Sequence, residues 1–306
     1  MRVFQTIRRS LGTGGLALLL GGCGATHLAT NGEPAAAQMP LTPSVDSTPI
    51  EAERYAPAGW PEPLTARVRL PDTSSDGLRP AALIVHGGGW RGRSPDDMEN
   101  IARKLAGQGY VTVNIEYRFA PRYRFPAQLY DLQQAMRWMH DNAERFRIDT
   151  DRIVGVGYSS GAHLIALLAL ASQEGPLAEP YGGEHTRLAA AAVGGLPSDL
   201  LKFDDGPLVI NLLGGTRDEV PNAYVQASPI RHITPNAPPF FIFHGNRDQL
   251  VPVDHARDFY QALADQGTPA KLYLQHGRGH ITSFLLRGGT MKAAMAFLNR
   301  EVGMNE

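Results

Sequence analysis

The chain has 306 residues, a formal net charge of -1 and a single cysteine. This length allows one large α/β domain or two smaller ones, and the balanced charge gives no sign of a nucleic-acid binder. Charged residues make up 19% and apolar residues 43% of the chain, with 33 glycines and 23 prolines, which excludes a coiled coil or a fully disordered chain. The sequence has no HExxH or CxxC spacing, so we expect neither a catalytic metal nor a cofactor.

The first 22 residues have the pattern of a secretory signal peptide. Arg2, Arg8 and Arg9 precede an uncharged stretch, residues 11–22, that is too short to span a bilayer as a stable anchor. The stretch runs into Leu-Leu-Gly-Gly-Cys, which resembles the processing box of bacterial lipoproteins, with Cys23 as the new lipidated N-terminus. We expect export to the cell envelope and contact with a membrane through this lipid anchor only. A periplasmic or secreted protein is the alternative, and the arginine pair leaves the twin-arginine export route open.

Residues 24–49 consist largely of Ala, Thr, Pro, Ser and Gly, with few large apolar side chains. Such a segment cannot bury enough surface to fold by itself. We therefore predict a lipidated cysteine and flexible tether over residues 23–49 and one folded domain over residues 50–306.

Within this domain, strand-like and helix-like segments alternate. The strands are mostly short apolar runs, as expected in a parallel sheet that is covered on both faces. Their alternation with helices predicts a doubly wound, mostly parallel sheet. Residues 196–238 break the pattern and are predicted to form a small cap over the site. The predicted strands cover residues 66–70, 81–86, 111–117, 153–156, 188–193, 239–245 and 270–275.

The sequence Gly157-Tyr-Ser-Ser-Gly161 lies between an apolar strand and a helix that is rich in Leu and Ala. In this context it has the pattern of a nucleophile elbow, in which a strained turn exposes the central Ser159 at the carboxyl edge of the sheet. The flanking glycines avoid collisions in so tight a turn. The motif therefore indicates a serine nucleophile at residue 159.

A serine hydroxyl needs a base within hydrogen-bonding reach, and the base in turn needs a carboxylate to orient it. In an elbow fold these partners follow in the order Ser, Asp or Glu, His, on loops after later strands. Asp248 and His280 fit that order. Asp199 is an alternative acid, since it follows the preceding strand, and His276 is an alternative base.

Other candidates fit less well. His163 lies on the helix after the elbow, where packing or local bonding is usual, and we expect His244 to support its own loop. Asp254 has the position of an ordinary first-turn helix carboxylate. We expect the backbone amides of Gly88, Gly89 and Ser160 to form the oxyanion hole, because the run from His86 to Trp90 contains three glycines after a strand.

These motifs together resemble α/β-hydrolases of the carboxylesterase type, close to the feruloyl-esterase-like and hormone-sensitive-lipase branches, over residues 52–303. The sequence has Tyr-Ser-Ser at 158–160 where the hormone-sensitive-lipase branch usually has Asp-Ser-Ala, and it lacks a long N-terminal cap. Both differences favour the feruloyl-esterase-like group, which includes polysaccharide acyl esterases and arylformamidases. The matching pieces are HGGGW (86–90), the loop at 117–121, Phe-Pro at 125–126, GYSSGAHL (157–164), HGNRDQLVP (244–252) and Gly-His at 279–280.

The sequence thus predicts a serine carboxylester hydrolase that acts through an acyl-enzyme on small-molecule or carbohydrate esters. Short or aryl acyl groups are expected, because the predicted cap cannot supply a broad apolar lid. An arylformamidase with the same machinery is the second candidate, although export argues against it. A non-catalytic binding protein of the envelope is the third candidate. Such proteins generally lack a member of the catalytic triad, whereas this sequence has all three.

Overall fold

The computed structural model describes residues 24–30, 41, 44–73, 77–203 and 206–304. Within this part of the chain, ten strands form one sheet in the order β1-β10-β9-β8-β7-β5-β6-β4-β2, with β3 paired to β4. The strands are β1 (Ala25–Ala29), β2 (Ser47–Pro49), β3 (Glu53–Arg54), β4 (Thr65–Pro71), β5 (Arg79–Val85), β6 (Val111–Ile115), β7 (Ile148–Tyr158), β8 (Ala190–Gly194), β9 (Phe240–Gly245) and β10 (Ala270–Gln275).

The centre of the sheet is parallel and its edges are antiparallel. Strands β6, β5, β7, β8, β9 and β10 run in one direction. Strand β4 pairs antiparallel with β6 at one side, and β1 pairs antiparallel with β10 at the other. Every residue of β6, β8 and β9 is buried, which agrees with strands that are covered on both faces.

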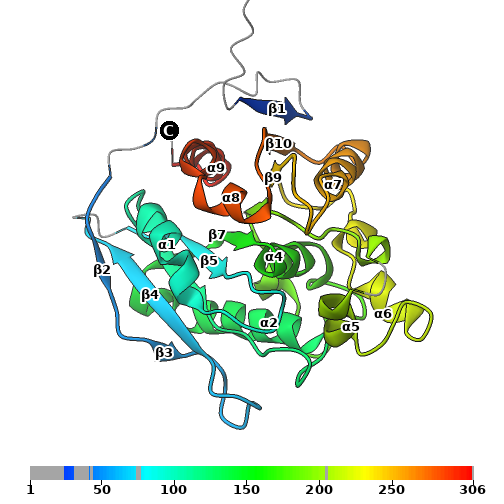
Figure 1. The fold of residues 1–306 in the computed structure, drawn as a ribbon. Helices are drawn as coiled ribbons and strands as arrows, with labels where there is room; N and C mark the ends of the chain where they lie inside the picture. Colours follow the sequence, from blue (N-terminus) through cyan, green and yellow to red (C-terminus); the bar gives the residue numbers. More distant parts are fainter. Residues whose placement is uncertain (1–23, 31–40, 42–43, 74–76, 204–205, 305–306) are drawn as a thin grey trace, which may run out of the picture.

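Helices cover both faces of the sheet (Figure 1). Side chains from α2, α4 and α7 join one core cluster, and those from α1 and α9 join the other. The sheet therefore lies between two helical layers, as a doubly wound fold requires. The helices are α1 (Glu99–Ala106), α2 (Ala127–Asp141), α3 (Ala143–Phe146), α4 (Ser160–Ala171), α5 (Pro207–Leu213), α6 (Pro221–Gln226), α7 (Asp254–Asp265), α8 (His280–Leu285) and α9 (Gly288–Glu301), with 3-10 turns η1 (Pro95–Met98), η2 (Glu184–Thr186), η3 (Leu200–Lys202) and η4 (Pro229–His232).

The predicted strands are all present, with boundaries that shift by a few residues. The largest difference is in β7, which begins at Ile148 rather than at residue 153. The short helix α8 was not predicted, because Gly-Arg-Gly before it favours a loop. The predicted cap region, residues 196–238, contains the short elements η3, α5, α6 and η4, as far as the structure describes it.

The prediction of a flexible tether is wrong at two places. Strand β1 adds to the edge of the sheet beside β10, and β2 pairs with β4 at the opposite edge (Figure 1). The composition of these segments is poor in apolar side chains, but an edge strand is held largely by backbone hydrogen bonds to its neighbour. The predicted signal peptide, residues 1–22, and the predicted lipidation site, Cys23, lie outside the described residues.

Candidate active site

A tight turn between β7 and α4 carries Ser159. This residue alone connects the two elements, with φ at 54° and ψ at -122°. Such a backbone is strained for a serine, and strain of this kind gathers at functional sites. A Cβ on Gly157 would lie 2.5 Å from the carbonyl oxygen of Gly161, and a Cβ on Gly161 would lie 2.2 Å from a backbone oxygen of β5. The turn predicted from the sequence is therefore observed, and close backbone contacts require its two glycines.

Three side chains from three separate segments, each following a strand, form a hydrogen-bond chain at the carboxyl edge of the sheet. The Ser159 Oγ lies 2.9 Å from His280 Nε2, and His280 Nδ1 lies 2.6 Å from Asp248 Oδ2. A carboxylate can only accept, so Nδ1 carries the proton and Nε2 presents its lone pair to the serine hydroxyl. The structure thus brings together the nucleophile, base and acid predicted from the sequence.

The carboxylate of Asp248 is buried and fully satisfied. Its Oδ1 accepts hydrogen bonds from the backbone amides of Leu250 at 3.0 Å and Val251 at 2.9 Å, and its Oδ2 also lies 3.3 Å from His244 Nε2. Burial acts to raise the pKa of Asp248, but the hydrogen bonds from His244 and His280 outweigh it and hold the pKa below its ordinary value. Asp248 is therefore charged at neutral pH.

Tyr158 positions the backbone of the histidine, a role that the sequence analysis did not assign. Its hydroxyl donates a hydrogen bond of 2.5 Å to the carbonyl oxygen of His280, and the two rings lie 5.2 Å apart. Burial raises the pKa of Tyr158, which keeps the hydroxyl protonated as a donor. The signal in the sequence was the departure from the usual Asp before the nucleophilic serine.

The alternative acids are engaged elsewhere. Asp199 Oδ1 caps η3 by accepting from the amide of Leu201 at 3.1 Å, and it also accepts from the Ser228 hydroxyl at 3.3 Å. Asp254 pairs with Lys202 at 2.7 Å in the first turn of α7. Neither has a hydrogen bond to the histidine at position 280.

The alternative histidines are also engaged elsewhere. His276 Nε2 lies 2.7 Å from the hydroxyl of Thr26 in β1 and is exposed. His244 Nε2 lies 2.8 Å from the carbonyl of Val251, which agrees with a supporting role in the loop of the acid. His163 is buried and connects parts of the site: its Nδ1 accepts from Trp90 Nε1 at 3.2 Å, and its Nε2 donates to the carbonyl of Ala227 at 2.6 Å.

The glycine run after β5 lies beside the serine. Gly88 has φ at 125° and Gly89 has φ at 62°, so both adopt backbone that favours glycine. Both line one pocket of about 390 Å³ together with Ser159 and His280. Ser160 occupies the first position of α4, next to the nucleophile, and the amides at the start of a helix are free to bind an anion.

The walls of this pocket differ in chemistry. Leu208 from the cap, Leu250 and three residues of α8 provide an apolar side. Arg91 and Arg93, on the loop after the glycine run, provide a cationic side; Arg93 lies 3.6 Å from Asp97. Leu208 comes from the segment that the sequence analysis expected to lie over the site. The three residues of α8 are Ile281, Phe284 and Leu285.

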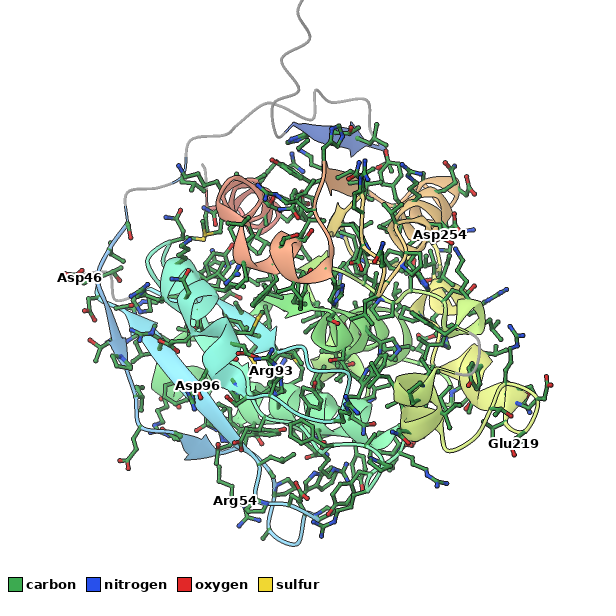
Figure 2. The ribbon with its side chains drawn as sticks, viewed as in Figure 1. Asp46, Arg54, Arg93, Asp96, Glu219 and Asp254 are labelled. Carbon is green, nitrogen blue, oxygen red and sulfur yellow. The ribbon has the colours of Figure 1, made fainter. Side chains whose placement is uncertain are left out.

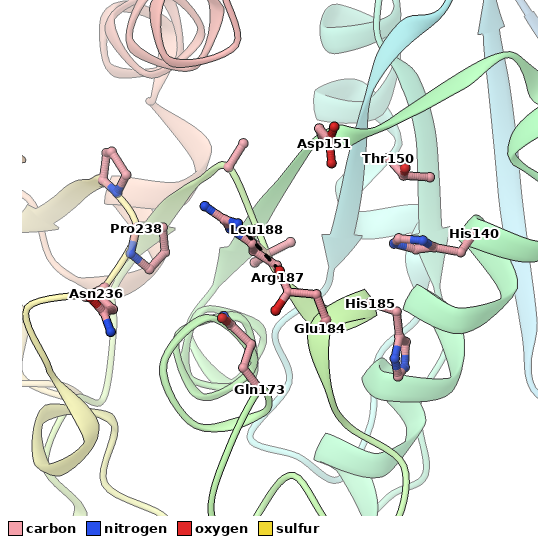
Figure 3. Close-up of a pocket in the computed structure, with 13 residues that line it drawn as sticks. His140, Thr150, Asp151, Gln173, Glu184, His185, Arg187, Leu188, Asn236 and Pro238 are labelled. Carbon is pink, nitrogen blue, oxygen red and sulfur yellow. Dashed lines mark hydrogen bonds and ion pairs between the residues drawn. The ribbon is translucent and has the colours of Figure 1, made fainter.

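A second cavity, of about 800 Å³, lies near the amino ends of the parallel strands, opposite the edge that carries Ser159 (Figure 3). The cavity is lined by the residues just before β8 and by the loop before β9, and its titratable side chains include His140, Glu184, His185 and Arg187. Burial lowers the pKa of both histidines, and Arg187 pairs with Glu184 at 3.5 Å. The pair of a serine hydroxyl and an imidazole, Ser159 and His280 at 2.9 Å, lines the smaller pocket, so the chemistry of a serine hydrolase belongs there.

Two further observations hold for the described part of the chain. It contains no group of three or more His, Cys, Asp or Glu side chains arranged to bind a metal ion. None of its helices is both long enough and apolar enough to cross a bilayer.

Comparison with named proteins identifies relatives among esterases. The esterase LipC of Mycobacterium tuberculosis (strain ATCC 25618 / H37Rv) is 33% identical over 236 residues, which are 72% of this chain and 58% of LipC. The chain spans about half the length of the curated relatives it matches.

Solved structures give the same fold. A truncated carbohydrate esterase from gut microbiota is 22% identical, with a TM-score of 0.76 over 86% of this chain and 99% of that chain. The Thermogutta terrifontis esterase Est2 with bound propionate is 26% identical, with a TM-score of 0.69 over 82% of this chain and 93% of that chain. The family profile BD-FAE matches residues 68–263, which is more than half of the sequence. The chain therefore has the α/β-hydrolase fold and belongs to the BD-FAE family.

Proposed function

We propose that the protein is a serine carboxylester hydrolase that works through an acyl-enzyme. The observation that carries the proposal is the chain from Ser159 Oγ through His280 to Asp248, at 2.9 Å and 2.6 Å. Ser159 attacks the ester carbonyl while His280 Nε2 takes its proton, and the same nitrogen returns the proton to the leaving alcohol. Water then attacks the acyl-enzyme with His280 again as base. Asp248 keeps the proton on Nδ1 and stabilises the imidazolium.

The amides of Gly88, Gly89 and Ser160 are proposed to bind the oxyanion of each tetrahedral intermediate. Their support is position: the two glycines line the pocket with the nucleophile, and Ser160 begins the helix behind it. The positive end of the α4 dipole adds to the stabilisation of negative charge at this place.

The proposal is tested by pre-steady-state kinetics with p-nitrophenyl acetate. A burst of nitrophenol that matches the number of active sites, and an acetyl group found on Ser159 by mass spectrometry, are expected. Release of nitrophenol without a burst, together with no acetylated serine after quenching in acid, would contradict an acyl-enzyme that accumulates during turnover.

For the substrate, we propose esters with short or aryl acyl groups, including esters of carbohydrates. The pocket of about 390 Å³ supports this choice, and so do the similar solved structures, which include a carbohydrate esterase and an esterase with bound propionate. A panel of p-nitrophenyl esters, feruloyl esters, acetylated xylan and N-formylkynurenine tests it. We expect kcat/KM to be highest for acetyl to butyryl or feruloyl esters; a steady rise up to decanoyl would indicate a lipase, and a preference for the formamide would indicate an arylformamidase.

We further propose that the protein is exported and that Cys23 carries the lipid anchor. The support is the lipoprotein-like sequence before the only cysteine of the chain. Several acyl chains give durable membrane attachment, whereas one gives only reversible binding. Cys23→Ser should move the protein from the membrane fraction to the soluble fraction, and unchanged membrane association would contradict the anchor.

A further inference from the structure

Exposed apolar side chains gather at the mouth of the pocket around Ser159. Of the seven large hydrophobic residues that are exposed in the described part of the chain, four lie at the carboxyl edge of the sheet, on α8 with its C-cap and on the neighbouring loop after β9. They are between 52% and 66% exposed. Single exposed apolar residues are ordinary, but a cluster beside a functional pocket indicates a binding surface. This cluster, called the apolar rim below, consists of Leu250, Ile281, Leu285 and Leu286.

The two segments that carry the apolar rim are cationic. Residues 276–288 contain two arginines and no Asp or Glu, and the loop after β9 adds Arg247 with one carboxylate, the buried Asp248. Arg91 and Arg93 lie on the other side of the same mouth (Figure 2 labels Arg93). On that side Asp97 is paired with Arg93 and Asp96 with Arg67. The rim is thus surrounded by a local excess of positive charge, although the whole chain has a net charge of -1.

The register of β1 brings the N-terminal part of the chain to this same edge. Ala25 pairs with Gln275, the last residue of β10, and the amide of His276 donates to the carbonyl of Gly24 at 3.0 Å. The carboxyl ends of the parallel strands, including β10, form the edge at which Ser159 and His280 lie. Gly24 is therefore fixed at the active-site edge, and Cys23 precedes it by one peptide bond.

We propose that the apolar rim docks on an anionic lipid surface, so that the mouth of the active site faces the membrane. Apolar side chains with arginines around them suit the boundary between acyl chains and anionic headgroups. A second copy of the chain suits the rim less well, because a symmetric contact would bring the arginines of one copy against those of the other. The position of Gly24 favours the same orientation. Strand β1 holds Gly24 at the active-site edge, so a lipid on Cys23 would bring this edge next to the membrane.

This docking rests on the proposed lipid anchor at Cys23 but not on the proposed hydrolysis, and its test uses no substrate. The full chain is exported and processed by a bacterial host, purified in detergent and reconstituted into vesicles of phosphatidylcholine with one quarter phosphatidylglycerol. An environment-sensitive fluorophore is attached at Leu286→Cys in the rim. Leu78→Cys is the matched control, because Leu78 is equally exposed but precedes β5 at the opposite edge. The unsubstituted chain is treated with the same fluorophore, so that any signal from a label on Cys23 can be subtracted.

The label at position 286 should shift to the blue with vesicles and be quenched by nitroxide-labelled lipids, whereas the label at position 78 should do neither. Leu250→Cys, on the neighbouring loop, provides a second reporter and should behave like position 286. Each arginine near an anionic surface strengthens binding roughly fivefold. Pure phosphatidylcholine vesicles should therefore weaken the quenching, because they carry no anionic headgroups. Salt at 1 M should weaken it too, because the Debye length falls to about 3 Å.

Several results would overturn the docking. Equal quenching at positions 286 and 78, or none at either, would mean that the domain does not present this face to the lipid. A blue shift at position 286 that needs no vesicles and grows with protein concentration would show that a second copy covers the rim. If quenching depended neither on phosphatidylglycerol nor on salt, the arginines would have no role in docking, and the proposed preference for an anionic surface would be wrong.

Discussion

Two cavities lie at opposite edges of the same sheet, and both contain histidines in the company of carboxylates. The larger one holds His140 and His185, whose rings lie 6.2 Å apart and perpendicular. The smaller one holds His280, which lies between a carboxylate and a hydroxyl in a directed chain of hydrogen bonds. The difference shows that volume and the number of titratable groups do not make a catalytic site. What makes the catalytic site is the partner of each imidazole nitrogen: Nδ1 of His280 bonds to a carboxylate and Nε2 bonds to a serine hydroxyl.

The largest effect in this comparison should come from removing the hydroxyl at the active-site edge. Ser159→Ala removes the nucleophile while keeping the backbone of the turn, so kcat/KM for p-nitrophenyl acetate should fall by about 10⁴-fold or more. The midpoint of thermal unfolding should hardly change, because the side chain contributes no core packing. Hydrolysis near the wild-type rate would show that Ser159 is not the nucleophile.

The next effect separates two carboxylates that the sequence leaves as competitors. Asp248→Asn should lower kcat by about 10⁴-fold, because an amide that donates to His280 Nδ1 leaves the imidazole in the wrong tautomer. Asp199→Asn is the matched control and should retain activity, since Asp199 caps η3 and bonds to Ser228. The opposite ranking in steady-state kinetics would move the acid to the loop after β8.

A third effect concerns stability in acid and the buried histidine behind the nucleophile. Burial lowers the pKa of His163 to about 4. An unfolded histidine takes up a proton below about pH 6.5, so the unfolded chain binds this proton at a higher pH than the folded chain. The contribution of His163 to the free energy of unfolding is therefore complete above pH 6.5 and is lost as the pH falls toward 4, by at most about 3 kcal/mol.

His163→Gln tests this contribution. A glutamine amide does not titrate, and it can still accept from Trp90 and donate to the carbonyl of Ala227. Urea unfolding between pH 4 and 7 should show a flatter profile for the variant than for the wild-type chain. Parallel profiles would mean that other groups, such as His255, whose pKa burial also lowers to about 4, account for the acid sensitivity.

The residues that the sequence predicted are those fixed by local motifs and by chain order. The elbow at Ser159 is local, and the positions of Asp248 and His280 follow from the strands before them, because parallel strands end at one edge. The strand β1 could not be predicted in this way: it is held by backbone pairing with β10, a partner some 240 residues away that leaves no pattern in residues 24–30. The role of Tyr158 depends on the same long-range closure, through its bond to the carbonyl of His280.

The smallest effect is expected at the larger cavity. The two cavities are compared most directly by replacing one histidine in each of them with glutamine. His280→Gln removes the base and should abolish turnover, since glutamine cannot take up the serine proton. His185→Gln removes an imidazole that has no serine or carboxylate chain attached to it, and kcat/KM should stay within about twofold of wild type, the range expected for a change away from the reacting groups. Both variants should be compared at pH values from 5 to 8. The His185→Gln profile should follow the wild-type profile; a changed profile would show that the two edges of the sheet are coupled and that the larger cavity takes part in the reaction.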